Sequence, residues 1–303
     1  MRDGLTRRDF LRHAAAAGVA AAGFGGLVDG LSAEAAAGPT IAVASKHDPA
    51  GLVRASVQAL GGMGKFVKKG ALVLVKPNIG WARRPEQAAT TNPAVVAEIV
   101  RLCKQAGARE VRVMDHSVDR PDAVVLKMTG IQRAAEDAGA RVSMASSPAL
   151  YESVKIRKGR ALKSAEVMRD LRRADVVINV PIAKVHGQTG LTFGLKNMMG
   201  TVWDRGAFHG SESLDQAIAD YATEIRPDLV IVDAIRILLT NGPKGPGKTA
   251  DKGIVVAGTD PLAVDAYAAT LFGWKPEKVG HLKAAHQAGV GEIDLGRITI
   301  KHV

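Results

Sequence analysis

Cysteine and aromatic residues are scarce in this chain of 303 residues. Its one cysteine, Cys103, excludes a disulfide within the chain, and a single thiol cannot hold an iron–sulfur cluster. Aromatic residues make up only 4% of the sequence, which leaves few rings on which nucleic-acid bases could stack. The apolar residues are mainly Ala, Val, Leu and Ile, a balance that favours helices packed on a buried sheet over an all-β shell.

Dense clusters of one charge are also missing. The formal net charge is +11, yet no run of five or six basic residues occurs. A dispersed solubilising charge therefore explains the excess better than a nucleic-acid footprint, and we expect no nucleic-acid partner. The excess nevertheless favours small anionic partners that carry phosphates or carboxylates.

Long hydrophobic runs are absent near the N-terminus. The Ala/Gly-rich segment 14–28 is too short and too weakly apolar for a bilayer span, which needs about 20 strongly apolar residues. It follows the run Arg-Arg-Asp-Phe-Leu at residues 7–11 and precedes three alanines at 35–37. This combination resembles a twin-arginine export signal with a small-residue cleavage site, and an ordinary N-terminal helix is the alternative.

Residues 1–37 are therefore predicted to be a twin-arginine signal peptide, and residues 38–303 the mature α/β domain. The expected partner is the twin-arginine export machinery, and the expected location is the periplasm or outside the cell membrane. No stable membrane span is expected after cleavage. Because this route carries folded proteins, a cofactor could be loaded before export, but the sequence leaves its identity open.

The mature region alternates apolar runs with helical patterns that end in glycine. A strand is predicted at 71–75 and a helix at 93–105, with Asn92 as its N-cap and Gly107 at its end. Further strands are expected at 40–45, 110–114, 141–145, 176–180, 229–232, 253–257 and 297–303, and residues 151–162 are expected to form a hairpin or an edge excursion. This alternation implies right-handed crossovers and predicts an α/β fold: a mostly parallel sheet flanked by helices, in a single elaborated domain.

The stretch 174–200 is the most unusual part of the chain. Its apolar strand stops at Asn179 and Pro181, and polar residues then alternate with four glycines, which indicate close backbone approach to a ligand. The polar residues are Lys184, His186, Gln188, Thr189, Thr192, Lys196 and Asn197. We therefore predict a binding site here.

Other predicted strands end in the same kind of residue, and ligands of open α/β sheets bind at the carboxyl ends of the strands. These ends carry Lys76 and Asn78, Asp115 and His116, Asp233, and Thr259 and Asp260. Lysines would neutralise an anionic small molecule and amides would orient it, so ligand binding is assigned to Lys76, Asn78, Asn179, Lys184, Thr192, Lys196 and Asn197. Proton transfer is assigned to His186 and Asp233. As alternatives, the asparagines are caps or turn residues and Asp260 is an N-cap.

Residues 242–249 match the letter pattern of a phosphate-binding P-loop. Pro243 and Pro246 each remove a backbone N–H, and the strand expected directly afterwards leaves no room for the required helix. A basic, glycine-rich flap over a nearby site is the preferred interpretation, with a plain surface loop as the alternative. No His-x-His, His-x-x-Glu-His or paired-cysteine pattern occurs, so no metal site is predicted.

Six motifs together resemble the domain of unknown function 362 family. They are Lys76-Pro77-Asn78, Asn179-x-Pro181-x-x-Lys184-x-His186, Gly190-x-Thr192, Leu195-Lys196-Asn197-x-x-Gly200, Pro227-Asp228-Leu229-x-Ile231-x-Asp233-Ala234 and Asp260-Pro261-x-Ala263-x-Asp265. The resemblance covers nearly the whole mature chain in the family's order. Many members carry an attached ferredoxin-like cysteine module, which implies redox or cofactor-related work. This chain lacks that module.

Three functions remain open from the sequence. The first is an enzyme acting on an anionic small molecule, with Lys184 and Lys196 neutralising charge and His186 or Asp233 transferring protons. The second is a non-catalytic carrier for a cofactor or metal, or a redox-associated accessory protein, loaded before export. The third is a nucleic-acid binder, which the scattered charge and scarce aromatics make the weakest.

Overall fold

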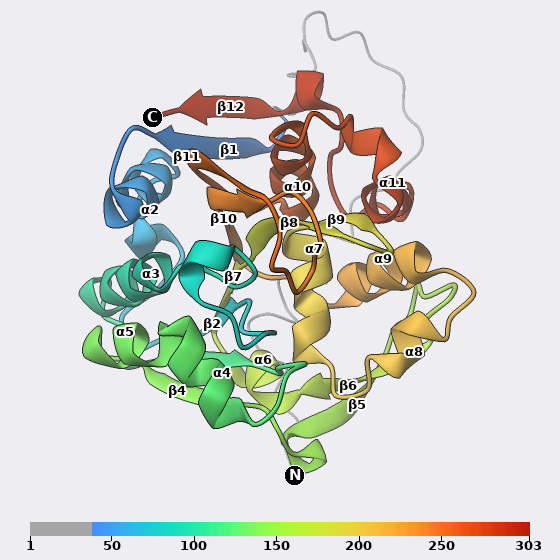
Figure 1. Cartoon of the computed structure of the whole chain (residues 1–303), viewed down its shortest axis with the longest axis horizontal. Helices are drawn as coiled ribbons and strands as arrows, with labels where there is room; N and C mark the ends of the chain where they lie inside the picture. Colours follow the sequence, from blue (N-terminus) through green and yellow to red (C-terminus); the bar gives the residue numbers. More distant parts are fainter. Residues whose placement is uncertain (1–37) are drawn as a thin grey trace, which may run out of the picture. The chain divides into compact units, whose positions relative to one another are not determined.

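The computed structural model describes residues 38–303, which form one unit (Figure 1). The predicted export signal at residues 1–37 lies outside the described residues. The main sheet has ten strands in the order β12-β1-β11-β10-β7-β2-β3-β4, with β8 beside β10 and β9 beside β8. Its strands are β1 (Thr40–Ser45), β2 (Leu72–Pro77), β3 (Glu110–Asp115), β4 (Arg141–Met144), β7 (Val176–Val180), β8 (Ile182–His186), β9 (Gly190–Thr192), β10 (Leu229–Leu238), β11 (Thr249–Gly258) and β12 (Thr299–His302).

Most neighbouring strands are parallel, and only β11 and β9 run antiparallel to their neighbours. The helices are α2 (Pro49–Ala59), α3 (Pro93–Gln105), α4 (Asp122–Thr129), α5 (Ile131–Asp137), α6 (Arg169–Arg173), α7 (Gly194–Asn197), α8 (Gly206–His209), α9 (Leu214–Glu224), α10 (Pro261–Thr270) and α11 (Gly280–Gln287). A separate antiparallel pair, β5 (Tyr151–Lys155) and β6 (Ser164–Met168), forms the hairpin expected near residues 151–162. The predicted fold class, a mostly parallel sheet flanked by helices, is confirmed.

Helices cover both faces of the sheet. Along β2, Val73 and Val75 pack in one core with α2, α3 and α5, whereas Leu74 belongs to the other core, with α9, α10 and α11. Figure 1 shows the first group of helices on the left and the second on the right. Because a parallel strand is buried on both faces, its sequence is continuously apolar, which is why these strands were recognisable. No helix among residues 38–303 is long and apolar enough to cross a membrane.

The local signals at helix ends were accurate. The Asn92 side chain accepts a hydrogen bond from the backbone N–H of Ala94 (2.9 Å), and Pro93 occupies the first turn of α3. Asp260 likewise caps α10, because its Oδ1 accepts from the N–H groups of Leu262 and Ala263. Each of these residues is a short polar N-cap followed by a proline in the first helical turn, as expected from the sequence.

The direction of β11 corrects one prediction. β11 runs antiparallel to both β1 and β10, so its carboxyl end, with Thr259 and Asp260, lies at the opposite edge of the sheet from the other strand ends. A second correction concerns β10, which continues past Asp233 to Leu238 because it pairs with β11 along that length. Asp233 is therefore inside a strand and not at a strand end.

Candidate functional site

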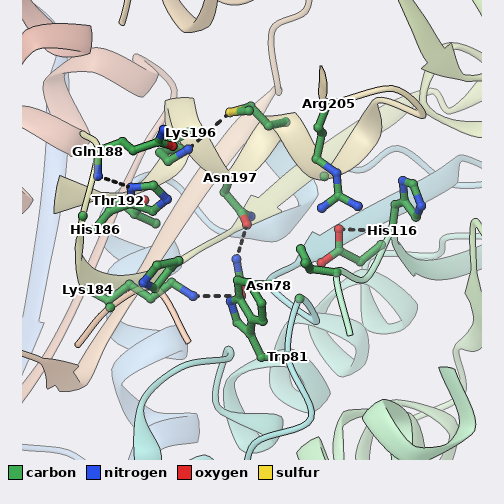
Figure 2. A pocket seen from close by; sticks show the side chains of 18 of the residues that line it. Asn78, Trp81, His116, Lys184, His186, Gln188, Thr192, Lys196, Asn197 and Arg205 are labelled. Carbon is green, nitrogen blue, oxygen red and sulfur yellow. Dashed lines mark hydrogen bonds between the residues drawn. The ribbon is translucent and has the colours of Figure 1, made fainter. Parts of the chain in front are cut away.

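A cavity of about 390 Å³ opens at the carboxyl ends of β2, β3 and β8, beneath α7 and the loop that follows it. Figure 2 shows that its side chains come from strands, from α7 and from loops. The predicted residues that line it are Lys76, Asn78, Lys184, His186, Thr192, Lys196 and Asn197. Asn179 and Asp233, which were also predicted, do not line it.

The hairpin of β8 and β9 places polar groups on one face. Lys184 is paired with Thr192 and His186 with Gly190, whereas the intervening Leu191 is fully buried in the core. Because side chains alternate across a strand, Lys184, His186 and Thr192 all point to the cavity side. Gly190 has a φ of +70°, and a Cβ there would lie 2.9 Å from the ring of Trp274, so only glycine fits this turn.

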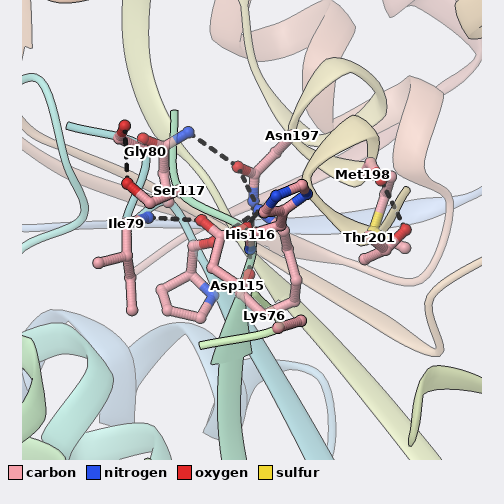
Figure 3. Close-up of polar contacts among 12 residues, drawn as sticks. Lys76, Ile79, Gly80, Asp115, His116, Ser117, Asn197, Met198 and Thr201 are labelled. Atoms are coloured by element: carbon pink, nitrogen blue, oxygen red, sulfur yellow. Dashed lines mark hydrogen bonds and ion pairs between the residues drawn. The ribbon is translucent and has the colours of Figure 1, made fainter. Parts of the chain in front are cut away.

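A buried ion pair forms the floor of the cavity (Figure 3). Lys76 Nζ lies 2.8 Å from Asp115 Oδ1, and the two side chains are only 1% and 2% exposed. Asp115 also accepts hydrogen bonds from the backbone N–H groups of Ile79 (2.6 Å) and His116 (2.9 Å). Burial lowers the pKa of Lys76, and the neighbouring Asp115 opposes that effect. Both charges therefore have hydrogen-bond partners within the protein, which a buried ion pair needs to offset its desolvation cost.

Gly200 explains the last position of the Lys196-Asn197-x-x-Gly200 motif. A Cβ at this position would collide with Asp115 Oδ1 and would lie 2.6 Å from Lys76 Nζ. The glycine therefore lets the chain after α7 close directly over the ion pair.

An amide network continues from this ion pair. Asn197 Oδ1 accepts from Lys76 Nζ and from Asn78 Nδ2, both at 3.0 Å. Asn197 Nδ2 donates to Asn179 Oδ1 (2.8 Å), and Asn179 Nδ2 donates to the carbonyl of Gly194 (2.8 Å). Asn179 therefore orients Asn197 from behind, which corrects its assignment as a ligand-binding residue.

The short helix α7 is fixed by a carboxylate on α10. Asp265 accepts hydrogen bonds from the N–H groups of Gly194 and Leu195, each at 2.8 Å. Burial raises the pKa of Asp265 to about 7. This contact explains why the Asp260-Pro261-x-Ala263-x-Asp265 motif accompanies the site motifs, because α7 carries Lys196 and Asn197.

Lys184 is almost wholly buried, with 1% of its surface exposed. Its Nζ donates to the carbonyl of Ala89 (2.6 Å) and to Asn78 Oδ1 (3.3 Å). Burial, with a smaller contribution from Lys76, lowers its pKa to about 7. Both the ammonium and the free amine are therefore populated near neutral pH, as expected of a group that transfers protons.

Lys196 and Arg205 have no carboxylate within ion-pair distance among residues 38–303. The Lys196 Nζ hydrogen bond among these residues is to the sulfur of Met199, at 3.4 Å; burial lowers the pKa of Lys196 to about 8, and the charge of Asp215 opposes that effect. The Arg205 guanidinium donates to the carbonyl of Ser117 (3.1 Å), and burial lowers its pKa. Arg205 was missed because it lies in a polar loop with no strand before it.

His186 is held by the hairpin turn. Its Nδ1 accepts from the N–H groups of Gln188 (3.1 Å) and Thr189 (3.4 Å), which places the proton of the neutral ring on Nε2. Burial, helped by Lys196, lowers its pKa to about 3. His186 is therefore a hydrogen-bond donor at neutral pH and is poorly suited to the acid–base role predicted for it.

Asp233 has a structural position. It is fully buried, its Oδ2 accepts from the N–H of Asn92 (2.7 Å) and its Oδ1 from that of Ile235 (3.1 Å). Burial raises its pKa to about 6. The carboxylate holds the start of α3 against β10, so the predicted proton transfer by Asp233 lacks access to the cavity.

The P-loop look-alike lies at the cavity, where Gly242 and Pro243 line its wall. Thr249 begins β11, so no helix follows, as predicted. The Arg83 side chain donates to the carbonyl of Lys244 (3.1 Å), and Lys244 Nζ pairs with Asp119 at 2.9 Å. These contacts fasten residues 242–249, called the flap below, to the loops that follow β2 and β3.

Two further observations concern possible ligands. Thr192 Oγ1 is buried and has no hydrogen-bond partner within the described residues. Among the same residues, no group of three or more His, Cys, Asp or Glu side chains is placed to hold a metal ion.

The fold and cavity thus define an α/β protein with a cavity lined by basic side chains at the carboxyl edge of its sheet. The family model described as "Domain of unknown function (DUF362)" matches residues 73–270, more than half of the chain. The chain belongs to this family, which confirms the resemblance seen in the sequence.

A thylakoid-associated protein of Synechocystis is 29% identical over 251 residues, which cover 78% of this chain and 74% of that protein. Two solved structures are similar at low identity. One is a protein from Thermotoga maritima (TM-score 0.45, 14% identity, 74% of this chain and 58% of that one). The other is the lactate racemase apoprotein from Thermoanaerobacterium thermosaccharolyticum (TM-score 0.44, 12% identity, 81% and 56%). The chain spans a little over half the length of each solved chain.

Proposed function

We propose that this protein is an enzyme that binds a small organic anion in the cavity and transfers a proton with Lys184. The observation that carries the proposal is the convergence of Lys76, Lys184, Lys196 and Arg205 on a cavity whose one carboxylate, Asp115, is already paired. The cavity of about 390 Å³ is within the size range of small-molecule sites. Its excess of positive charge selects an anion.

The roles follow from the contacts. Two acceptors, the Ala89 carbonyl and Asn78 Oδ1, fix the direction of Lys184 Nζ and leave its third position for the ligand. As a free amine it accepts a proton from the ligand, and as an ammonium it returns one. His186 contributes an Nε2–H hydrogen bond and Asn197 orients the ligand.

Binding should be linked to proton uptake. The pKa values of Lys184 and Lys196 are lowered to about 7 and about 8 by burial, so part of each group is neutral at pH 8. An anion beside them favours the charged forms and raises both pKa values. Affinity is therefore expected to fall as pH rises from 7 to 9, and calorimetry in two buffers of different ionisation enthalpy would measure the protons taken up.

The binding test uses the full chain and a panel of small carboxylates and phosphates in a thermal-shift screen. We expect stabilisation by members of the panel, its loss in Lys196→Met, and its retention in Lys283→Met, which removes an exposed lysine on α11. Equal stabilisation of Lys196→Met and wild type would refute the assignment of the cavity. Native mass spectrometry separates the carrier alternative, which requires a stoichiometric cofactor or metal on the purified protein.

The catalytic test follows hydrogen exchange of the same panel compounds in D₂O by proton NMR. We expect at least one stabilising compound to lose a C–H signal with the wild type and to keep it with Lys184→Met. The variant should still bind, because Lys196 and Arg205 remain. Exchange at the wild-type rate in Lys184→Met would contradict the proton-transfer role.

We also propose that the chain is exported by the twin-arginine route, on the support of the sequence at residues 7–11. Replacing Arg7 and Arg8 by lysine should retain the full chain in the cytoplasm, as measured by cell fractionation. Arg12→Lys is the matched control and should be exported. Export of the Arg7→Lys, Arg8→Lys variant would reject the proposal.

A further inference from the structure

We propose that the ligand carries two anionic groups, one bound at Lys196 and the other at Arg205. The inference rests on the proposed function, because it assumes that the cavity binds a small anion. It names the class of ligand as a short organic dianion, such as a dicarboxylate or a phosphorylated carboxylate.

The first support is the contrast between the cations of the cavity. Lys76 has a carboxylate partner in Asp115 at 2.8 Å, and Lys184 has two oxygen acceptors. Among the described residues, Lys196 hydrogen-bonds only to a sulfur and Arg205 has one carbonyl for its five N–H donors. Asp215 and Asp115 act on them only through space, outside ion-pair distance. A buried cation without a compensating anion is costly, and arginine cannot relieve that cost by losing its proton. Each of these two groups therefore calls for an anionic partner.

The second support is an unpaired hydroxyl at the Lys196 end. Thr192 is 4% exposed, and its Oγ1 has no hydrogen-bond partner among the described residues. His186 offers its Nε2–H on the same face of the β8–β9 hairpin. Figure 2 shows Thr192, His186 and Lys196 together at one side of the cavity. An ammonium, a hydroxyl and an imidazole N–H form a set of donors for one carboxylate or phosphate group.

The Arg205 end is built by different elements. Arg205 follows the 3-10 turn after α7 and donates to the carbonyl of Ser117, just beyond β3. His116 lies beside it, stacked on Trp203 with a ring separation of 5.1 Å. In Figure 2, Arg205 and His116 are on the opposite side from Lys196, with Asn78 and Asn197 between. Asp115 favours the charged form of Arg205 through space, but its ion pair is with Lys76, and it lies outside ion-pair distance of Arg205.

Lys196 and Arg205 are carried by different elements, Lys196 by α7 and Arg205 by the loop after the 3-10 turn, and Asn78 and Asn197 lie between them in Figure 2. The proposed ligand therefore carries its two anionic groups at opposite ends of a short chain, as the dicarboxylates do.

The test compares matched mono- and dianions by isothermal titration calorimetry with the full chain. The dianions are malonate, succinate and glutarate, the monoanions are propanoate and butanoate, and inorganic phosphate is a compact single group. We expect at least one dicarboxylate to bind about 10- to 100-fold more tightly than its monocarboxylate, since each charged hydrogen-bonded contact has that value. Lys196→Met and Arg205→Gln should each remove this advantage, and Lys283→Met should keep it.

The outcomes separate the inference from the proposed function. If butanoate binds as tightly as succinate and Arg205→Gln has no effect, the cavity still binds an anion but the second anionic group is refuted. If phosphate binds best and both variants weaken it equally, one group bridges the two cations, which also overturns the inference. If no anion in the set binds, both the dianion inference and the proposed function are refuted.

A second measurement does not depend on any ligand. Because Lys196 forms no ion pair within residues 38–303, the ligand-free Lys196→Met variant should unfold at the same denaturant concentration as the wild type, or at a higher one. A clearly lower midpoint would show that the ammonium is already satisfied within the protein, and would refute the inference.

Discussion

The lowered pKa of Lys184 makes the stability of the ligand-free protein depend on pH in a calculable way. The pKa is 10.5 for a free lysine and about 7 in the folded protein, with burial as the main cause. Between these values the unfolded chain binds one more proton than the folded one, so the free energy of unfolding rises with pH. The penalty is absent above pH 10.5 and complete below about pH 7.

The magnitude follows from these two pKa values. A full proton difference changes stability by about 1.36 kcal/mol per pH unit. Between pH 7 and pH 9 the folded-state lysine goes from half protonated to neutral, while the unfolded one stays protonated. The integrated gain is about 2 kcal/mol for this group alone.

The assay is denaturant unfolding of the full chain at pH 7, 8 and 9, with wild type and Lys184→Met side by side. The variant also leaves the Ala89 carbonyl without its donor, but that loss shifts the whole profile and not its slope. We expect the wild type to gain about 2 kcal/mol relative to Lys184→Met between pH 7 and pH 9. Lys283→Met, an exposed lysine, should run parallel to the wild type. Parallel profiles for wild type and Lys184→Met would refute the reasoning, because Lys184 would then titrate alike in both states.

Three further predictions test the construction of the site. Gly200→Ala should destabilise the protein by about 1–3 kcal/mol in a denaturant titration, because the added Cβ would meet the buried Lys76–Asp115 pair. Gly64→Ala is the control and should be nearly neutral in the same titration, because no atom lies within 4 Å of its Cβ. Asn179→Ala should lower the free energy of unfolding by about 1–3 kcal/mol, because the Asn197 amide loses the acceptor Asn179 Oδ1. Anion binding measured by calorimetry should weaken as well. Unchanged binding would show that Asn197 is oriented by its other contacts. Lys244→Ala removes the flap's partly exposed ion pair with Asp119, so the free energy of unfolding should change by less than about 1 kcal/mol. Anion release should nevertheless become faster in stopped-flow measurements. An unaltered release rate would exclude the flap as a barrier to anion release.

Two assigned residues, Asp233 and Asn179, share one feature with Asp260. All three were placed at the rim because each ends an apolar run, and all three hold helices or other site residues in position; for Asp260 this is the N-cap that the sequence already indicated. A carboxylate or amide that caps a helix and one that binds a ligand have the same composition and the same local setting. Only the partner atoms distinguish them, and those come from distant parts of the chain.

Arg205 is the opposite case, a residue that lines the cavity but was not singled out from the sequence. It has no apolar strand directly before it, so the strand-end pattern that marked the other site residues does not mark Arg205. It reaches the cavity because the chain after α7 passes over β3, where its guanidinium meets the carbonyl of Ser117. The loop's richness in polar residues was the one signal available.

The sequence by itself determined most strands of the sheet, though not β8 and β9, together with helix caps and the polar content of the edge at Lys76, Lys184 and Lys196. These depend on periodicity, propensity and short-range hydrogen bonds, which a linear sequence displays. Tertiary structure alone decided which strand ends share an edge, because the antiparallel β11 turned Asp260 to the far side. It also decided which charges are paired. Lys76 found Asp115 across β2 and β3, while Lys196 and Arg205 were left unpaired, because burial and ion pairing depend on distances that only the packed chain fixes.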